Sequence, residues 1–339
     1  MPCSKMNSKS EIIDVLDGQF KGPLPPPVIL TQTGTLGLMK RSGAYWPEAN
    51  FDKDKMVKLS LQPHESFGLA TARVPYDVVI QAEAVGCSII PGTEKTQPAV
   101  SGSPWRETGT VPEFPKDIIS IEEMLEFPHL RNVIDAADTL HKNEDLFVTS
   151  MCVCGGGIVM HMLGMENMIM GMMMDPETVR KYLVVMTNYS AAYAHELSKV
   201  SDNVCVITDM LSDIIPPDMI SFSVSLNKKV FEAIDSSYSM IHNCGNTMNN
   251  VEDLVSLNSD IISLEMSSNP EGYMKKINGR RKVLGCISPL GVMLNGSPDD
   301  VRKKALWSAE LGVDLVGPEC GLAPLTPDAN IEALSSYRS

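Results

Sequence analysis

The sequence lacks long hydrophobic runs. None of its 339 residues lies in a stretch that approaches the roughly twenty consecutive apolar residues of a membrane-spanning helix, so we expect no membrane span. The first residues, Met-Pro-Cys-Ser-Lys-Met, also lack the apolar core of a secretory signal. We therefore expect a cytoplasmic protein.

Positive charge is scarce as well. The chain has 28 lysines and arginines against 42 aspartates and glutamates, which gives a formal net charge of −14. Such a surface repels the phosphates of nucleic acids, so we expect no nucleic-acid partner. Charged residues make up 21% of the chain and hydrophobic residues 43%, a balance that indicates a globular protein rather than a disordered one.

Eight short apolar runs recur along the chain, and helix-length segments such as 298–311 separate most of them. The runs are 28–31, 69–74, 146–151, 204–208, 238–241, 260–264, 282–285 and 314–316. The segment 298–311 has the signals of a helix: Ser297 as N-cap, Pro298 in the first turn and Gly312 after its end. Strands that alternate with helices eight times predict a parallel (β/α)8 TIM barrel. The alternative is a doubly wound open sheet, but no G-x-G-x-x-G motif follows any run.

The rest of the chain is interpreted as part of the same domain. We expect a single TIM-barrel domain over 1–339, with residues 1–27 as an N-terminal extension. The segments 35–68 and 90–140 are too long for simple barrel helices. We interpret them as insertions near the barrel mouth that form a lid.

A His-x-Cys pair follows one of the apolar runs. His242 and Cys244 come after 238–241 and before a turn. Residues two apart in a strand point to the same face, so these two side chains can bind one ion. The best candidate for a third soft ligand is Cys320, which also follows an apolar run and precedes a turn. One imidazole and two thiolates suit a catalytic zinc site that keeps a position open for substrate.

Acidic side chains also end predicted strands. Glu265 follows the run 260–264, and we expect its carboxylate to fill the fourth zinc position until substrate displaces it; the alternative is a solvated loop acid. Asp77 and Asp209 each end a run, where barrels place active sites. We expect catalytic roles for both, the alternative being carboxylates that cap loops.

The remaining cysteines, histidines and methionines give weaker signals. Cys152 and Cys154 lack convincing further ligands and are interpreted as small side chains that line the pocket before a Gly-rich turn. The methionines of 161–174 are interpreted as adaptable core filling, with a flexible apolar surface as the alternative. Three cysteines in apolar runs are expected to be buried and unreactive: Cys87, Cys205 and Cys286. Four histidines are expected on the surface or on helices, without ligand-like partners: His64, His129, His141 and His195.

Five motifs stand out in combination: T-Q-T-G (31–34), G-A-Y-W-P-E-A (43–49), R-V-P-Y-D (73–77), H-N-C-G-N (242–246) and G-P-E-C-G-L-A-P-L-T-P (317–327). Together they resemble the corrinoid-dependent coenzyme M methyltransferases of methylotrophic methanogens, which belong to the uroporphyrinogen decarboxylase superfamily. The resemblance runs from about residue 28 to the C-terminus, and the segment 152–174 departs from the family pattern.

The resemblance implies a TIM barrel in which His242, Cys244 and Cys320 hold Zn²⁺. It implies methyl transfer from a methylated corrinoid, carried by a separate corrinoid protein, to the thiol of coenzyme M. Binding to zinc would keep that thiol deprotonated at neutral pH. The cobalt of the corrinoid would supply the difficult chemistry, and the protein would supply alignment.

Three alternative functions remain open from the sequence. Porphyrinogen decarboxylation needs cations for many substrate carboxylates, and T-Q-T-G-T lacks the two-arginine R-Q-A-G-R signature of the decarboxylases. A site closed by four protein ligands would favour a non-catalytic metal or corrinoid binding protein, and an open site would not. The same zinc chemistry with another thiol or a folate as acceptor fits the motifs equally well. The sequence assigns no residue to the sulfonate of coenzyme M.

Overall fold

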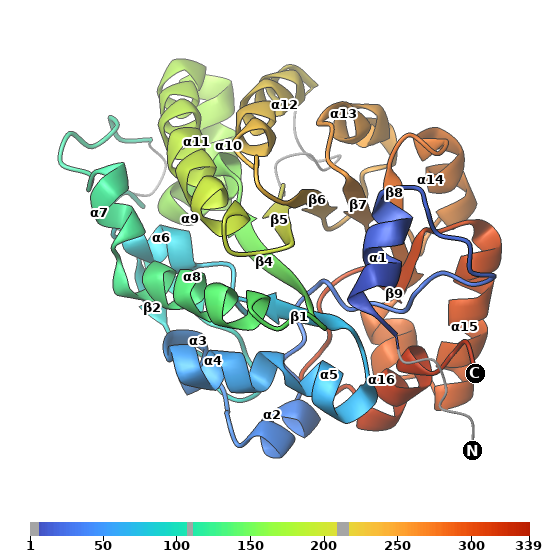
Figure 1. Cartoon of the computed structure of the whole chain (residues 1–339). Helices are drawn as coiled ribbons and strands as arrows, with labels where there is room; N and C mark the ends of the chain where they lie inside the picture. The colour runs from blue at the N-terminus through green and yellow to red at the C-terminus, as the bar shows by residue number, and fades with distance from the viewer. Residues whose placement is uncertain (1–6, 107–110, 209–216) are drawn as a thin grey trace.

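The centre of the molecule is one curled, fully parallel sheet. The structure is a computed structural model that describes residues 7–106, 111–208 and 217–339. Its seven sheet strands follow the order β1 (Thr71–Val74), β4 (Phe147–Val153), β5 (Asn203–Ile207), β6 (Tyr238–Asn243), β7 (Ile261–Leu264), β8 (Lys282–Ile287) and β9 (Leu315–Pro318). Helices surround the outside of this sheet (Figure 1). The TIM-barrel fold predicted from the strand–helix alternation is confirmed.

The segment before β1 occupies the remaining position of the barrel, between β9 and β1. Its first contact is a parallel bridge between Pro27 and Val316, and the Val28 N–H donates to the Val316 carbonyl at 2.9 Å. On the other side, the Ile29 N–H donates to the Thr71 hydroxyl. A regular strand over 28–31 was expected here, and that expectation is wrong. The consecutive prolines 25–27 have no N–H donors, so a regular ladder cannot form along this stretch.

The helices connect and cover the strands. In chain order they are α1 (Lys9–Leu16), α2 (Leu36–Ser42), α3 (Glu48–Phe51), α4 (Lys53–Ser60), α5 (Gln62–Phe67), α6 (Ile80–Ala84), α7 (Ile121–Leu125), α8 (Pro128–His141), α9 (Gly155–Leu163), α10 (Met165–Met174), α11 (Pro176–Ser198), α12 (Pro217–Glu232), α13 (Val251–Ser256), α14 (Pro270–Ile277), α15 (Pro298–Leu311) and α16 (Asp328–Ser335). A short antiparallel pair, β2 (Ser88–Ile90) and β3 (Ala99–Gly102), precedes α7. None of the helices in the described ranges is both long and apolar enough to cross a bilayer.

Helix α15 follows its sequence signals. The Ser297 hydroxyl accepts from the Asp300 N–H while the Asp300 carboxylate accepts from the Ser297 N–H, which is a complete capping box. Pro298 occupies the first turn, where a missing N–H costs nothing. Gly312 ends the helix at φ 93°, a left-handed conformation that glycine adopts without a steric penalty. The prediction of a helix over 298–311 is confirmed.

The alternation of side chains along the strands divides the core into two layers. Along β6, Met240 packs inside the barrel, while Ile241 packs between the sheet and the surrounding helices. The inner layer also contains Ile12 and Val15 of α1, which therefore covers one end of the barrel. The period of two returns His242 to the inner face at the opposite end of β6. The strands thus direct particular polar side chains toward the barrel mouth.

The segments 35–68 and 90–140 contain several of the helices. Residues 35–68 form α2 to α5, which pack against one another and beside β1 (Figure 1). Residues 90–140 include β3, α7 and most of α8. Because α8 contacts both β1 and β4, it has the position of the outer helix that connects these two neighbouring strands.

Candidate functional site

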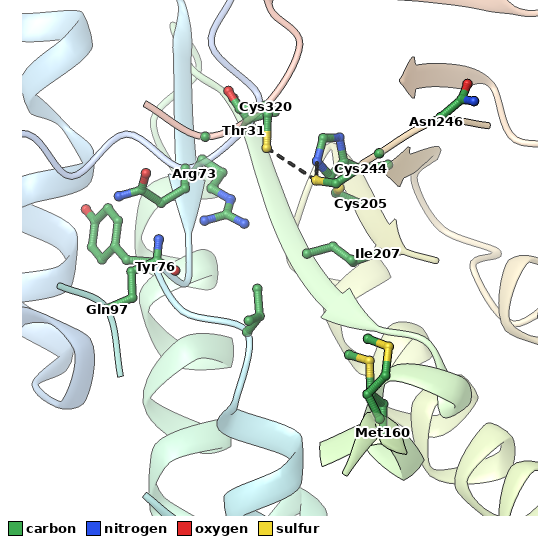
Figure 2. Close-up of a pocket in the computed structure, with 16 residues that line it drawn as sticks. Thr31, Arg73, Tyr76, Gln97, Met160, Cys205, Ile207, Cys244, Asn246 and Cys320 are labelled. Atoms are coloured by element: carbon green, nitrogen blue, oxygen red, sulfur yellow. Dashed lines mark hydrogen bonds between the residues drawn. The ribbon is translucent and has the colours of Figure 1, made fainter. Parts of the chain in front are cut away.

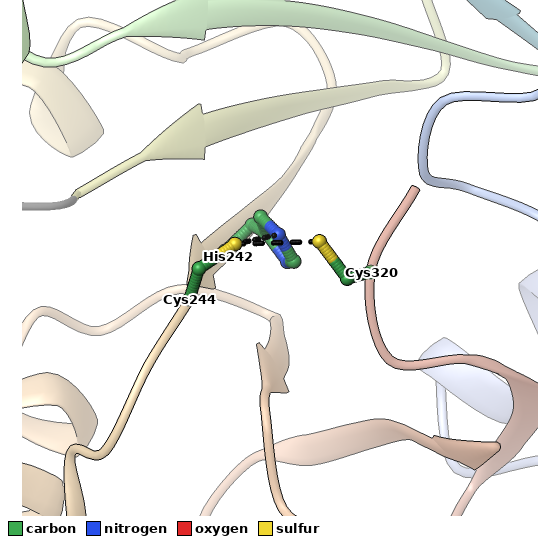
Figure 3. Close-up of side chains that lie close together, drawn as sticks. All are labelled: His242, Cys244 and Cys320. Atoms are coloured by element: carbon green, nitrogen blue, oxygen red, sulfur yellow. Dashed lines mark hydrogen bonds between the residues drawn. The ribbon is translucent and has the colours of Figure 1, made fainter. Parts of the chain in front are cut away.

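Three side chains from two distant parts of the chain meet at the barrel mouth. His242 is the last residue but one of β6, Cys244 follows that strand, and Cys320 follows β9. The Cys244 Sγ is 3.2 Å from the His242 Nε2 and 3.3 Å from the Cys320 Sγ (Figure 3). One ligand atom from each residue lies within 4.8 Å of the other two. The pairing of the His-x-Cys motif with the distant Cys320 therefore agrees with the fold.

A serine on the neighbouring strand fixes the imidazole. His242 and Ser263 occupy opposite positions in the register of β6 and β7, and the His242 Nδ1 lies 3.0 Å from the Ser263 Oγ. This hydrogen bond leaves Nε2 facing the two sulfurs. When Nε2 is a metal ligand, Nδ1 carries the proton and donates to the serine. Ser263 was not predicted, because nothing local in the sequence reports the register of two strands.

The loop that carries Cys320 is held on both sides. The Thr31 hydroxyl donates to the Cys320 carbonyl at 2.9 Å, and the buried Glu319 carboxylate accepts from the Met266 N–H at 3.0 Å. Burial raises the pKa of Glu319. Hydrogen bonds with Cys244 and His242 outweigh burial and lower the pKa of the Cys320 thiol to about 4. The site therefore favours a thiolate at Cys320.

Glu265 does not join this cluster. Its exposed carboxylate accepts from the Gly245 N–H at 2.8 Å, in the turn that follows Cys244. Among the described His, Cys, Asp and Glu side chains, the cluster contains only His242, Cys244 and Cys320. Glu265 as the fourth ligand stays a prediction; in the structure its carboxylate stabilises the turn after Cys244.

Asp77 does not belong to the cluster of His242, Cys244 and Cys320. Its carboxylate is fully buried, accepts from the Val79 N–H at 3.0 Å and lies 3.5 Å from the His129 Nε2 on α8. The arrangement is that of a carboxylate that caps a loop, which was the alternative to a catalytic role. His129, for which no partner was expected, also contacts Glu83 at 2.8 Å. Asp209, the other predicted catalytic carboxylate, lies outside the described residues.

A cavity of about 750 Å³ opens beside the three ligands. Apolar and sulfur-bearing side chains contribute much of its wall, among them Cys205, Ile207 and Met160 (Figure 2). Met165 also lines it. Arg73 is the one lysine or arginine among the described residues that line it. Several of the lining residues lie at or just after the ends of β1, β5, β6 and β9, so the cavity occupies the face on which TIM barrels carry their active sites.

The other cysteines within the described ranges lie in the core or the cavity wall. Cys205 is buried as expected, but it also lines the cavity, and burial raises its pKa to about 12, so it stays a thiol at neutral pH. Cys152 and Cys154 do not line the cavity, and that expectation is wrong. Cys152 packs outside the barrel because its neighbours in β4, Met151 and Val153, point inward. Two further cysteines are buried as expected: Cys87 and Cys286.

The methionines of 161–174 divide between both interpretations. Met162, Met168 and Met172 are buried in the core. Met173 and Met174 at the end of α10 are 73% and 74% exposed. The segment therefore fills core space and also presents an apolar surface, as expected of unbranched side chains that adapt to irregular surroundings.

The donor set defines what the site can hold. Two sulfurs and one imidazole nitrogen are the ligands that soft and borderline divalent metals prefer, zinc above all. Three protein ligands leave one position of a tetrahedral ion open. The hydrogen bond of His242 to Ser263 is the outer contact that metal-bound histidines usually make. The residues fit a catalytic rather than a structural zinc centre.

Comparisons with known proteins give matches that cover most of the chain. The family model described as uroporphyrinogen decarboxylase (URO-D) matches residues 7–339. A methylcobamide:CoM methyltransferase, MtaA, of Methanosarcina barkeri is 27% identical over 340 residues, which cover 99% of this chain and 98% of that protein. A second such enzyme, MtbA of Methanosarcina acetivorans, is 25% identical over 91% of both chains.

A solved structure gives the same relationship in three dimensions. A methyltransferase from Methanosarcina mazei superimposes with a TM-score of 0.87 at 26% sequence identity, and the match covers 97% of each chain. The similarity thus extends over the barrel, α1 and the helices around the mouth rather than over one motif.

Proposed function

This chain belongs to the uroporphyrinogen decarboxylase (URO-D) family, and we propose that it is a zinc-dependent methyltransferase. In this proposal it moves a methyl group from a methylated corrinoid, carried by a separate protein, to the thiol of coenzyme M, as a step of methylotrophic methanogenesis. The observation that carries the proposal is the convergence of His242, Cys244 and Cys320 beside the cavity. The full-length similarity to methylcobamide:CoM methyltransferases supports it.

Zinc would be held by His242 Nε2 and by the sulfurs of Cys244 and Cys320. When bound there, it supplies a Lewis acid that lowers the pKa of a coordinated acceptor thiol and keeps it a nucleophilic thiolate at neutral pH. Ser263 orients the imidazole, and Thr31 holds the backbone of the Cys320 loop. These two contacts keep the ligand atoms in place before substrate arrives.

The cavity aligns the two reactants and keeps water away from them. The acceptor sulfur uses its electron pair to form the new S–C bond. The electron pair of the Co–C bond stays with cobalt, which changes from Co(III) to Co(I), and the acceptor leaves as a thioether. Ile207, Met160 and Met165 offer apolar contacts to a methyl group and to a macrocycle at the mouth. The protein contributes position and a dry surface, and the corrinoid contributes the reactive bond.

Porphyrinogen decarboxylation is less well supported, although the family carries its name. Such a substrate presents many carboxylates and needs several cations, whereas Arg73 is the one lysine or arginine that lines the cavity within the described ranges. Decarboxylation of a porphyrinogen would also leave the two thiols and the imidazole without a role. A folate or another thiol as acceptor remains the second candidate, because the same three ligands would serve it.

A turnover assay tests the proposal. The zinc-loaded protein, free methylcobalamin as donor and coenzyme M as acceptor should yield methyl-coenzyme M and cob(I)alamin, followed by absorbance and mass spectrometry. Cys320→Ala should abolish turnover. Cys205→Ala, which removes a thiol from the same cavity but not from the ligand set, is the matched control and should keep it. Methylation of a folate or of another thiol, but not of coenzyme M, would move the function to the second candidate.

A further inference from the structure

Helix α10 exposes a side that consists mostly of methionine. Its sequence, M-E-N-M-I-M-G-M-M-M, contains one charged residue, Glu166. Four methionines, here called the methionine face, are exposed to solvent: Met165 by 46%, Met170 by 44%, Met173 by 73% and Met174 by 74%. A helix that only covers a core gains nothing from apolar side chains on its outer side. A contiguous apolar patch of this kind marks an interaction surface.

The methionine face is a fixed part of the fold. On the buried side of α10, Gly171 lies so close to Val111 and to Val179 of α11 that a Cβ at this position would overlap with their side chains. The helix therefore packs firmly beside α11 (Figure 1) and cannot turn its methionines inward without losing this contact. In contrast, the outer side of α8 carries charged residues such as Arg131 and Asp135.

The methionine face begins at the cavity. Met165, its first residue, lines the cavity, and so does Met160 on α9, the helix that packs against α10. Figure 2 shows Met160 and Cys320 at opposite ends of the cavity lining. The methionine face therefore continues the cavity wall outward, at the end away from Cys320.

The proposed reaction brings a large donor to the same place. A cavity of about 750 Å³ has the size of a site for a drug-sized ligand. A corrinoid, with its macrocycle and side chains, is larger than such a ligand, so it stays at the mouth and directs its methyl group inward. The protein that carries the corrinoid must then contact the surface around the mouth, to which α10 belongs.

We propose that the methionine face is the apolar core of the docking surface for the corrinoid-carrying protein, and that this partner presents an apolar face beside its corrinoid. The inference rests on the proposed function and names the contact that the donor makes with this chain. Methionine side chains are flexible and polarizable, so they adapt to an apolar partner. Since Glu166 is the one charge of α10, docking depends on apolar contact rather than on ion pairs and responds little to salt.

The test compares a protein-borne donor with a small one in the zinc-loaded enzyme, with coenzyme M as acceptor. The corrinoid proteins encoded by the same genome are purified one by one, loaded with cobalamin and methylated, and free methylcobalamin is the small donor. The double variant Met170→Lys/Met173→Lys puts two charges on the exposed side of α10. It should lower kcat/KM for the protein donor that the wild type uses best by about 10- to 100-fold, mostly through KM. Its kcat/KM for free methylcobalamin should equal that of the wild type.

Controls separate docking from a general effect of added charge. Leu306→Lys makes the same kind of change on α15, where Leu306 is 39% exposed, and should leave transfer from both donors unchanged. Met170→Leu/Met173→Leu keeps the face apolar and should keep most of the transfer from the protein donor. Calorimetry with the methylated corrinoid protein should show weaker binding to the lysine double variant, and wild-type binding should differ little between low and high salt. Zinc content and circular dichroism should be equal in all variants.

Several results would overturn the inference. Equal transfer from the protein donor by the wild type and the lysine double variant would mean that docking occurs elsewhere. An equal loss with both donors would assign the methionine face to the fold. A wild type that uses free methylcobalamin but none of the protein donors would leave the face without this partner.

Other occupants of the methionine face give different results. A wild-type dimer that dissociates in the lysine double variant, seen by sedimentation, would assign the face to a second copy of the chain. Binding of phospholipid vesicles by the wild type but not by this variant would assign it to a lipid surface. Either result without a change in transfer from the protein donor contradicts the inference. If the proposed function fails, no thiol is methylated from either donor, while calorimetry still measures whether a corrinoid protein binds.

Discussion

The Nδ1 of His242 lies 3.0 Å from the Oγ of Ser263, directly across the pairing of β6 and β7. This contact connects the sheet register to the chemistry of the site. It fixes the ring plane and leaves Nε2 beside the Cys244 sulfur at 3.2 Å. Removing an outer partner of a metal-bound histidine commonly costs 10- to 100-fold in metal affinity.

Ser263→Ala should therefore weaken zinc binding by roughly 10- to 100-fold while the protein stays folded. Competition with a chromophoric chelator measures the change. Ser259→Ala is the matched control, since Ser259 is equally buried and its hydroxyl meets no partner among the described residues. Equal zinc affinities in the two variants would mean that the hydrogen bond to His242 does not contribute.

The ligand set itself makes a second prediction. The purified protein should contain about one zinc per chain, and His242→Ala, Cys244→Ala or Cys320→Ala should each deplete it. Elemental analysis after dialysis gives the content. Full zinc retention by Cys320→Ala would refute the pairing of the two distant motifs.

Glu265→Gln separates the two roles considered for Glu265. An amide oxygen can still accept from the Gly245 N–H, so the variant should keep both its fold and its zinc. Loss of zinc in this variant would restore Glu265 as a ligand, with a carboxylate that moves from the turn to the ion.

Whether the sequence could predict a contact depends on how far apart the contacting residues lie along the chain. Period two along β6 was enough to place His242 and Cys244 on one face, and the rule that parallel strands end at one mouth was enough to add Cys320. To predict the contact with Ser263, the register of two strands would have to be known, and no single stretch of sequence encodes that register. The carboxylate of Asp77 pairs with His129, more than fifty residues further along the chain, and that long-range partner decided its orientation.

The segment 28–31 shows the same limit of sequence-based prediction, here for backbone hydrogen bonds. The apolar run 28–31 looks like the other runs, but three prolines precede it, so backbone donors are missing where the ladder should begin. Arg73 is a similar case within the site. Its sequence context, R-V-P-Y-D, does not reveal that its side chain is buried and lines the cavity.

The His129 contacts predict a pH-dependent stability. Burial lowers the pKa of His129, but the contacts with the carboxylates of Asp77 and Glu83 outweigh it and raise the pKa to about 9 from 6.5. The folded pKa is above the unfolded one, so this stabilisation is full below pH 6.5 and declines as the pH rises toward 9. The shift corresponds to about 3 kcal/mol in the free energy of unfolding.

His129→Gln should therefore be less stable than the wild type at low pH, and the difference should shrink as the pH increases through this window. Denaturant titrations in the presence of a chelator measure it without a contribution from metal. His195→Gln is the control, because His195 is 39% exposed and lies beside an exposed Asp235. A difference that does not vary with pH would show that His129 contributes packing against Phe51 rather than charge.

Removing zinc should abolish activity and leave the fold largely intact. The three ligands sit at the ends of strands whose inner and outer layers are packed without them, unlike a small zinc finger that has no other core. Circular dichroism before and after chelation gives the measurement. Cooperative unfolding on chelation would make the site structural and remove the basis for a catalytic ion.

The last prediction connects the site to the reaction. Three described protein groups form the cluster, so one position of a tetrahedral zinc is left for a water, another light-atom ligand or the substrate. Coenzyme M should replace that oxygen or nitrogen neighbour by sulfur, and a proton should be released because the thiol binds as thiolate. X-ray absorption at the zinc edge and a pH-indicator titration measure the two effects.

Methyl-coenzyme M is the control. It cannot form a thiolate, so it should release no proton. Unchanged coordination at saturating coenzyme M would end the thiolate mechanism, and a change with only another thiol would keep the mechanism and reassign the acceptor.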